Sequence, residues 1–291
     1  MSILLPTTLG FTRQAQLWRW LLASGTLAIF SAISLRFLDF DSVFCRTGSD
    51  RTGALPGECF YFIHSSAARL GIKTHLWCVL PAGILAAIQF VPAVRRPPLT
   101  RIHRVSGYLS IALGLVGSVA ALPTIRYAFG GDLPSQVATT LLLLIFVVAQ
   151  IAGYVCIRRR DIIHHRQWML RSWFYAGSVI TMRLIMALAA LSISLIGGYY
   201  LAMPCDKVNS ILKSREETLR WYPECSDDPL RRVIVDADVF APNKVPFAAA
   251  FNLAYGMSAW LAIVSHAVGV ELYIQSQSPR KPATGSAKKS R

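Results

Sequence analysis

The chain has 291 residues, of which 54% are hydrophobic and only 15% charged, and its formal net charge is +15. Soluble domains contain about 25% charged residues, so this composition excludes an ordinary water-soluble domain and predicts an integral membrane protein. The sequence also lacks GxxxxGK[ST], GxGxxG and GxSxG motifs, which leaves no basis for predicting a P-loop NTPase, a Rossmann-type nucleotide site or a serine hydrolase of the elbow type.

Six apolar stretches approach the length of about 20 residues that a helix needs to cross a bilayer. They predict an all-α bundle of about six transmembrane helices. In chain order, the stretches cover residues 17–38, 75–94, 105–127, 137–157, 168–197 and 246–270.

The spans divide the chain into a short N-terminal segment, one transmembrane domain and a tail. We expect residues 1–16 to be cytosolic, residues 17–270 to form the domain, and residues 271–291 to be a basic, disordered cytosolic tail. Two outer loops, 39–74 and 199–245, are long enough to carry structure of their own.

The distribution of Lys and Arg predicts the orientation, because cytoplasmic flanks carry the excess of these residues. With a cytosolic N-terminus, the inner segments hold 16 Lys and Arg against only Asp161 and Glu271. The outer segments hold 13 Lys and Arg against 13 Asp and Glu. Both termini are therefore predicted to be cytosolic. The basic inner face is expected to attract anionic lipid head groups, and we expect no nucleic-acid partner.

The cysteines agree with this orientation. Cys45 and Cys59 fall in the first outer loop, and Cys205 and Cys225 fall in the last. Disulfides persist in oxidising compartments such as the lumen of the endoplasmic reticulum. Pairing within each loop needs the least chain closure, while pairing between the loops stays open.

The last outer loop contains two further local patterns. The segment VNSILKSREETLRWY at 208–222 loosely fits an amphipathic helix. The segment RRVIVDADVF at 231–240 is a candidate short strand, bounded by prolines.

The chain ends in a dilysine pattern. Lys288 and Lys289 resemble the signal that returns membrane proteins to the endoplasmic reticulum, and such a signal is read by a receptor at a cytosolic C-terminus. We therefore predict residence in the endoplasmic reticulum membrane, with the plasma membrane as the alternative.

Several motifs resemble a known family. They are His75 at the start of the second span, Gln89 and Arg95 near its end, HRVSGY at 103–108, and RRRDIIHHRQWMLRS at 158–172 followed by TMRL at 181–184. Together they resemble the predicted membrane proteins grouped as domain of unknown function 2306. The resemblance implies a multi-span bundle with polar residues at the inner face, and it implies no reaction.

Four histidines gather at the inner face once the topology is fixed. His103, His164, His165 and His266 are contributed by three spans. Facing imidazoles can hold a haem b, or they can hold a transition metal with Asp161 as a further ligand or partner. The alternatives are contact with a substrate or a phosphate, and simple hydrogen bonding at the membrane interface.

Arg183 is the one charged residue deep within a predicted span. It follows His165 by 18 residues, or five helical turns at 3.6 residues per turn, so the two side chains are predicted to share a face. A charge in a membrane faces a cavity or a partner, or it extends to the interface. We expect Arg183 either to orient a substrate as a catalytic residue deep in a cavity that has His165 at its inner mouth, or to reach the outer interface. Asp161 is the other candidate catalytic residue.

Carboxylates are missing from the middle of every span. A strong acid would have to come from a loop or an interface, and the candidates are Asp161, Glu271, Asp132 and Glu58. The sequence thus favours a membrane-embedded enzyme that acts on a hydrophobic small molecule, with a redox role for the histidines. A non-enzymatic carrier, channel or scaffold is the second hypothesis, and a metal-free cyclase or isomerase is the third.

Overall fold

Six helices in the computed structural model are long and apolar enough to cross a membrane. The structure describes residues 9–46, 53–226, 228 and 230–277. The predicted six-span bundle is confirmed, and each predicted stretch falls within or largely overlaps one observed span. These are Gln14–Leu38, Ser66–Gln89 (α5), Thr100–Ile125 (α6), Leu133–Arg158 (α7), Ile162–Ile196 (α8) and Lys244–Gln277 (α11).

The first span is built from several short helical pieces. It begins as α2 (Gln14–Trp20), widens into a π turn at Leu21–Gly25, continues as α3 (Thr26–Ser34) and ends in a 3₁₀ turn at Leu35–Leu38. Such π turns occur where a helix is interrupted, frequently at functional sites. This one lies beside the cavity described below.

Small residues bring the central helices close together. A Cβ at Gly117 of α6 would lie 2.7 Å from Val79 Cγ1 of α5, and a Cβ at Gly71 would lie 2.6 Å from the Ala120 carbonyl oxygen. Close packing of this kind is how helices associate within a bilayer. The α5–α6 pair therefore forms one side of the bundle, while α8 packs against α7 and α11 on the other.

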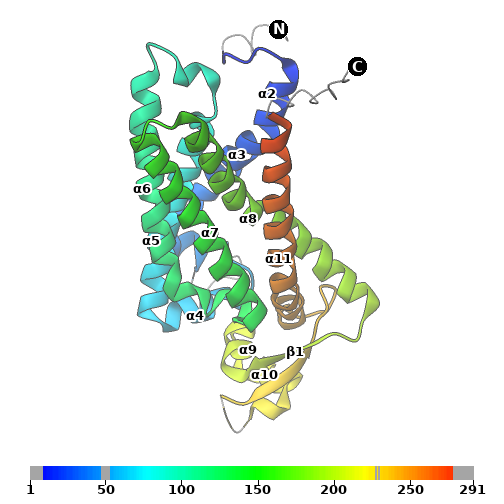
Figure 1. Ribbon diagram of the computed structural model, residues 1–291. Coiled ribbons are helices and arrows are strands. Elements are labelled where there is room, and N and C mark those ends of the chain that lie inside the picture. The colour runs from blue at the N-terminus through cyan, green and yellow to red at the C-terminus, as the bar shows by residue number, and fades with distance from the viewer. Residues whose placement is uncertain (1–8, 47–52, 227, 229, 278–291) are drawn as a thin grey trace, which may run out of the picture.

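The two ends of the bundle differ in structure. The start of α2 and the end of α11 lie together, and we call this the inner end; the large loops lie at the opposite, outer end (Figure 1). Large apolar side chains such as Leu188, Leu195 and Val148 are exposed around the bundle. An apolar outer surface is what a bilayer requires.

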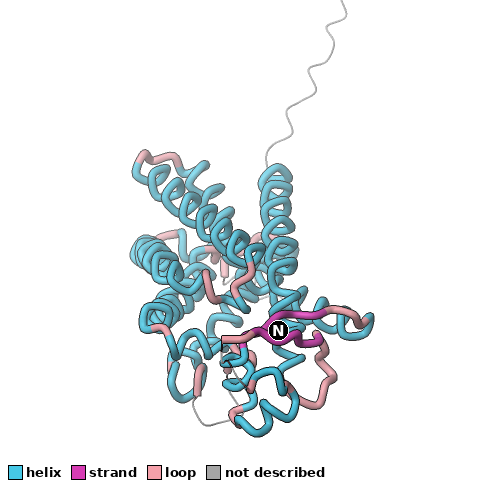
Figure 2. Tube along the Cα trace, turned by 90° about the horizontal axis from the view of Figure 1, so that it is seen from below, coloured by secondary structure: helices cyan, strands magenta, loops and turns pink. Residues whose placement is uncertain are grey.

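The outer end carries a small cap on the bundle. Strands β1 (Tyr200–Pro204) and β2 (Arg232–Asp236) pair antiparallel at this end, which Figure 2 shows from below with the strands in magenta. The alternating burial of β2 places Val233 and Val235 inward, as a half-buried strand requires. The predicted strand is thereby confirmed. The cap is completed by α4 (Glu58–His64), α9 (Cys205–Leu212) and α10 (Arg215–Trp221).

Several predicted boundaries shift in the structure. The prediction of a single amphipathic helix at 208–222 is wrong. Lys213 adopts a φ of 59°, and the segment forms two helices, α9 and α10. Residues 271–277, expected to belong to a disordered tail, instead continue α11 to Gln277. Ile274 is buried in that last stretch, and Glu271 pairs with Arg171 of α8 at 2.5 Å.

Both disulfides form within their own loops, as the shorter closure predicts. Cys45 pairs with Cys59 and Cys205 pairs with Cys225. Cys205 and Cys225 are 1% and 0% exposed, in the core of the cap with Val208 and Val235. The second bond thus ties β1 and α9 to the segment that precedes β2.

We predict that removing the Cys205–Cys225 bond destabilises the cap. The double change Cys205→Ala, Cys225→Ala is expected to lower the free energy of unfolding by about 2–4 kcal/mol, because the open loop gains conformational entropy when unfolded. Thermal unfolding in detergent without reductant measures the effect. Cys156→Ala, at a free and partly exposed cysteine, is the control and should stay within about 0.5 kcal/mol of the wild type. Equal destabilisation by both changes would contradict the prediction.

Candidate functional site

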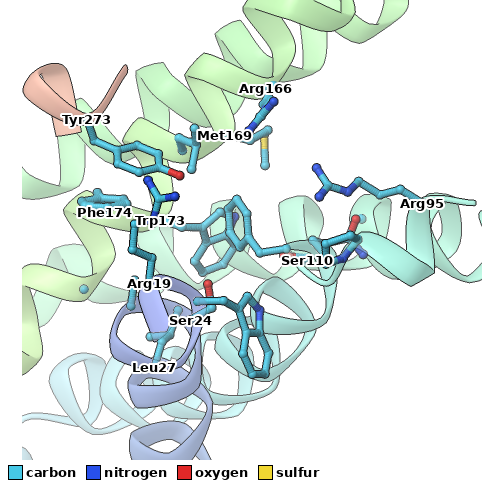
Figure 3. Close-up of a pocket in the computed structure, with 18 of the residues that line it drawn as sticks. Arg19, Ser24, Leu27, Arg95, Ser110, Arg166, Met169, Trp173, Phe174 and Tyr273 are labelled. Carbon is cyan, nitrogen blue, oxygen red and sulfur yellow. The ribbon is translucent and has the colours of Figure 1, made fainter. Parts of the chain in front are cut away.

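A cavity of about 840 Å³ opens at the inner end of the bundle. It lies between the first span and the inner parts of α5, α6, α8 and α11. Its wall includes aromatic and cationic side chains (Figure 3). Its size falls in the range of small-molecule sites, about 300–1,000 Å³. Three of the four predicted inner histidines line it, namely His103, His165 and His266.

His165 is held in the first turn of α8 by a backbone carbonyl. Its Nδ1 lies 2.8 Å from the carbonyl oxygen of Gly153 in α7. The glycine lets the two helices approach closely here, since a Cβ at position 153 would lie 2.6 Å from Met169 Sδ. A carbonyl only accepts hydrogen bonds, so Nδ1 carries the proton and Nε2 keeps a free lone pair. That nitrogen is therefore available to a proton or a ligand.

His103 faces the same cavity from the first turn of α6. Its Nδ1 is buried and has no hydrogen-bond partner among the described residues. The imidazoles of His103 and His165 are near enough to interact electrostatically. Buried polar atoms are rarely left unpaired in a protein, so the His103 nitrogen is a candidate contact for a bound molecule.

His266 uses both of its ring nitrogens in the structure. Nδ1 lies 2.7 Å from the Phe174 carbonyl oxygen and Nε2 lies 2.8 Å from Thr181 Oγ1, both on α8. His266 thus joins α11 to α8 and has no nitrogen free for a cofactor in this arrangement.

His164 and Asp161 lie outside the cavity. Asp161 is the N-cap of α8, where its carboxylate accepts a bond from the His164 backbone N–H at 3.1 Å and contacts His164 Nδ1 at 2.6 Å. Hydrogen bonds from the His164 backbone and then from its side chain lower the pKa of Asp161. Both side chains are well exposed. The pair therefore caps a helix, and it contributes nothing to the cavity wall.

Arg183 is not brought together with His165. It is absent from the cavity wall, and its Cζ lies 5.0 Å from the ring centroid of Phe30. Its charge instead acts on Glu58, at the start of α4. Of the two sequence-based alternatives for Arg183, the structure favours the one in which the side chain reaches toward the outer end.

A polar cluster lies at the outer end, around the half-buried Glu58 and the buried Lys207. Burial raises the pKa of Glu58, against the opposing charges of Lys207 and Arg183 and a hydrogen bond from the backbone of Phe129. Burial lowers the pKa of Lys207 despite the Glu58 carboxylate. Lys207 is only 2% exposed and lies with its Nζ 5.2 Å from the centroid of the Tyr61 ring.

Sequence reasoning named Glu58 only as one possible acid and missed Lys207 altogether. The one local signal that Lys207 is buried was its place beside Val208 and Ile211 on the apolar face of α9. Phe129 completes the cluster in a left-handed backbone conformation, with φ of 49°, and stacks on Tyr255 at 4.0 Å between ring centroids.

The described residues contain no group of three His, Cys, Asp or Glu side chains placed to hold a metal ion. The cavity wall also includes no carboxylate among the described residues. A metal site that uses Asp161 is therefore not assembled, because Asp161 is engaged with His164 at the surface. The polar groups on the described cavity wall are imidazoles, guanidinium groups, hydroxyls, side-chain amides and indoles.

The motifs that suggested a family resemblance converge on this cavity. Gln89 donates to Ser106 Oγ at 2.5 Å, which joins the end of α5 to HRVSGY. Arg95, His103 and Arg104 line the wall, as do His165 and Arg166 of the longest motif. His75 is different: its Nδ1 lies 2.8 Å from the Gly117 carbonyl oxygen, a contact that joins α5 to α6.

Comparison with known proteins gives a distant relative and a family. The chain is 22% identical to "Ava biosynthesis cluster protein G" of Aspergillus versicolor, over 93% of this chain and 91% of that protein. No solved structure matches. Residues 72–203, which include both helices that carry His103 and His165, match the family described as predicted membrane protein (DUF2306), as the HRVSGY and RRRDIIHHRQWMLRS motifs indicate.

Proposed function

We propose that the protein is a membrane-embedded enzyme of a biosynthetic pathway, and that it acts on a hydrophobic small molecule bound in the inner cavity. The observation that carries this proposal is the placement of two imidazoles, His103 and His165, on the wall of one cavity. The name of the relative from a biosynthesis cluster supports a biosynthetic role.

The chemistry best supported is proton transfer by these two histidines. His165 Nε2 has a free lone pair because Nδ1 is bonded to Gly153, so it can accept a proton. The buried Nδ1 of His103 has no partner among the described residues. An imidazole is suited to general acid–base catalysis near neutral pH. Without a carboxylate on the described cavity wall, protonation of an alkene is disfavoured, and isomerisation or cyclisation beside a carbonyl group is favoured.

A haem is the second candidate, and one observation favours it. Two imidazoles on different helices, His103 and His165, line the same cavity, and such a pair could hold a haem. The hydrogen bond from His165 Nδ1 to a carbonyl is also typical of histidines that bind a metal through Nε2. When bound, such a group would supply redox chemistry, and His103 and His165 would hold it. His266 would not take part, since both of its nitrogens are engaged.

Deuterium incorporation tests the proton-transfer proposal with any substrate that the native cells supply. Purified protein in deuterated buffer is incubated with lipid extracts of cells that produce it naturally, and mass spectrometry looks for a small molecule that gains deuterium. An absorption spectrum and metal analysis of the same sample test for haem. A Soret band lost in His103→Gln would favour the haem. A sample with neither incorporation nor bound haem would overturn the enzyme proposal in favour of a carrier or scaffold.

The orientation of the protein and the membrane in which it resides are proposed from the distribution of Lys and Arg, not from the cavity. We infer that the inner end faces the cytosol and that the protein resides in the endoplasmic reticulum, supported by the excess of Lys and Arg at that end. The paired cysteines at the opposite end are consistent with an oxidising lumen. Lys288 and Lys289 lie outside the described residues. Replacing both with Ala is expected to move a tagged protein to the cell surface in fluorescence microscopy, and unchanged retention would refute the signal.

A further inference from the structure

Guanidinium groups gather at the mouth of the inner cavity. Arg19, Arg95, Arg104 and Arg166 line it from four different elements: α2, the 3₁₀ turn Pro92–Arg95, α6 and α8. The charged ends of Arg95 and Arg166 extend toward the same space, and Arg19 lies beside Tyr273 (Figure 3). The Arg19 Cζ lies 5.9 Å from the centroid of that tyrosine ring.

These arginines have no carboxylate partner among the described residues. The two acidic residues of the inner end are engaged elsewhere, Asp161 with His164 and Glu271 with Arg171. The pKa of Arg95 is lowered by burial and by the charge of Arg166, which reflects like charges held close together. Like charges repel unless an anion lies between them, so the mouth is electrostatically suited to an anionic group.

Deeper in the cavity, two polar groups are left without a partner. Ser110 Oγ and Trp173 Nε1 are buried and make no hydrogen bond to the described residues. Both residues line the cavity, and they are only 1% and 7% exposed. A buried donor left unpaired costs about 1–3 kcal/mol. A hydrogen-bond acceptor on a bound molecule would give such a donor a partner.

The wall around these groups is largely apolar. Trp20, Leu27, Phe90, Ile111 and Phe174 line it, and aromatic side chains bind apolar matter through large contact areas. The cavity thus combines a cationic mouth, a largely apolar wall and two buried hydrogen-bond donors. This combination matches a molecule with an anionic end and a long apolar body.

We propose that the cavity binds an amphiphile whose head is an oxyanion, either a phosphate or a carboxylate, held chiefly by Arg95 and Arg166. Its apolar body lies along the aromatic wall, with an oxygen atom near Ser110 and Trp173. This inference rests on the proposed function and names the substrate class for it. Arginine is well suited to the head because its planar fork binds both kinds of oxyanion in a bidentate way.

Quenching of tryptophan fluorescence tests this inference, because Trp20 and Trp173 line the cavity. The probe is dodecyl phosphate brominated at the far end of its chain, added to protein in nanodiscs of phosphatidylcholine. The matched uncharged probe is bromododecanol. We expect saturable quenching by the phosphate and weaker quenching by the alcohol.

The variant Arg95→Gln, Arg166→Gln should weaken binding of the phosphate probe at least about tenfold, because charge-assisted hydrogen bonds are lost. Arg158→Gln, Arg159→Gln removes two charges from the same end but outside the cavity wall, and should stay within about twofold because exposed charges are screened. Arg95→Lys, Arg166→Lys keeps the charge and should bind with intermediate affinity. Equal weakening by the two Gln variants would overturn the proposal.

Competition distinguishes the sources of the anion. Displacement of the probe by phosphatidic acid in the nanodisc identifies a lipid head group, whereas displacement only by added dodecyl phosphate identifies a dispersed amphiphile. Displacement by inorganic phosphate at equal concentration would refute the role of the apolar wall. Binding is measured without turnover, so absence of saturable quenching refutes the amphiphile site alone. Absence of deuterium incorporation by the wild-type protein refutes the histidine chemistry alone.

Discussion

Replacing His103 or His165 with Gln is expected to reduce deuterium incorporation into the substrate by about 10²–10⁴-fold, the usual contribution of a general acid or base. Gln preserves a polar side chain of similar reach but cannot exchange a proton near neutral pH. At position 165 it can still donate to the Gly153 carbonyl, which His165 contacts at 2.8 Å. The loss therefore reports chemistry rather than a change in the fold.

His64→Gln is the matched control for both substitutions. His64 lies on α4 at the outer end, where its Nδ1 contacts the Phe60 carbonyl oxygen at 2.6 Å, far from the cavity wall. Its rate of incorporation should equal that of the wild type. His266→Gln provides a second comparison, since it tests a histidine that joins α11 to α8. If His266→Gln reduced the rate as much as His165→Gln with no loss of thermal stability, the assignment of roles would be wrong.

Hydropathy was sufficient to predict the bundle because length and apolar character are what a bilayer demands. The two disulfides could also be predicted, since each pair of cysteines lies in one loop and the lower cost of closing a short loop favours local pairing. The pairing of β1 with β2 could not be predicted from the sequence. Tyr200–Pro204 follows shortly after α8, and its partner is a segment about 30 residues further along the chain. Long-range pairing depends on tertiary packing that no local pattern contains.

Adjacent histidines show why the site could be predicted only in part. Successive residues of a helix point about 100° apart, so His164 and His165 meet different neighbours, and only His165 lines the cavity. Asp161 decides between them, because an Asp at the N-cap accepts from the backbone N–H three residues on, and here it also engages the side chain of His164. The helix geometry thus leaves His165 for the cavity.

Arg183 illustrates a different limit of sequence reasoning. Five full turns place it on the face of His165 in an ideal helix, yet the cavity wall on α8 ends near Thr181. Whether a face borders a cavity along its whole length depends on the neighbouring helices. In the structure, Arg183 meets Phe30 of the first span and the charge of Glu58. Both contacts come from segments more than 100 residues away in the chain.

Replacing Glu58 with Gln is expected to lower the free energy of unfolding at neutral pH by about 2 kcal/mol, because the buried Lys207 ammonium loses its counter-charge. Lys207→Met removes the buried charge and is expected to cost less, since the apolar side chain suits its surroundings of Val208 and Ile211. The double variant Glu58→Gln, Lys207→Met should lose less free energy of unfolding than the two single variants lose together, by a coupling energy of about 1 kcal/mol. Unfolding in mixed micelles measures all four proteins.

The pH dependence of the same series gives a second readout. Burial raises the pKa of Glu58 above the ordinary value of 4.5, so between 4.5 and neutrality the folded protein binds more protons than the unfolded chain, and this group makes stability fall as the pH rises. Burial lowers the pKa of Lys207 below 10.5, so stability rises with pH from mildly alkaline values toward 10.5. The difference in the free energy of unfolding between wild type and Glu58→Gln should therefore change with pH below neutrality. The corresponding difference between wild type and Lys207→Met should change with pH above neutrality. Arg183 and Tyr255 also face Glu58, but both keep their protonation state over the acidic window. A constant difference across the acidic range would show that Glu58 is not held in a buried site.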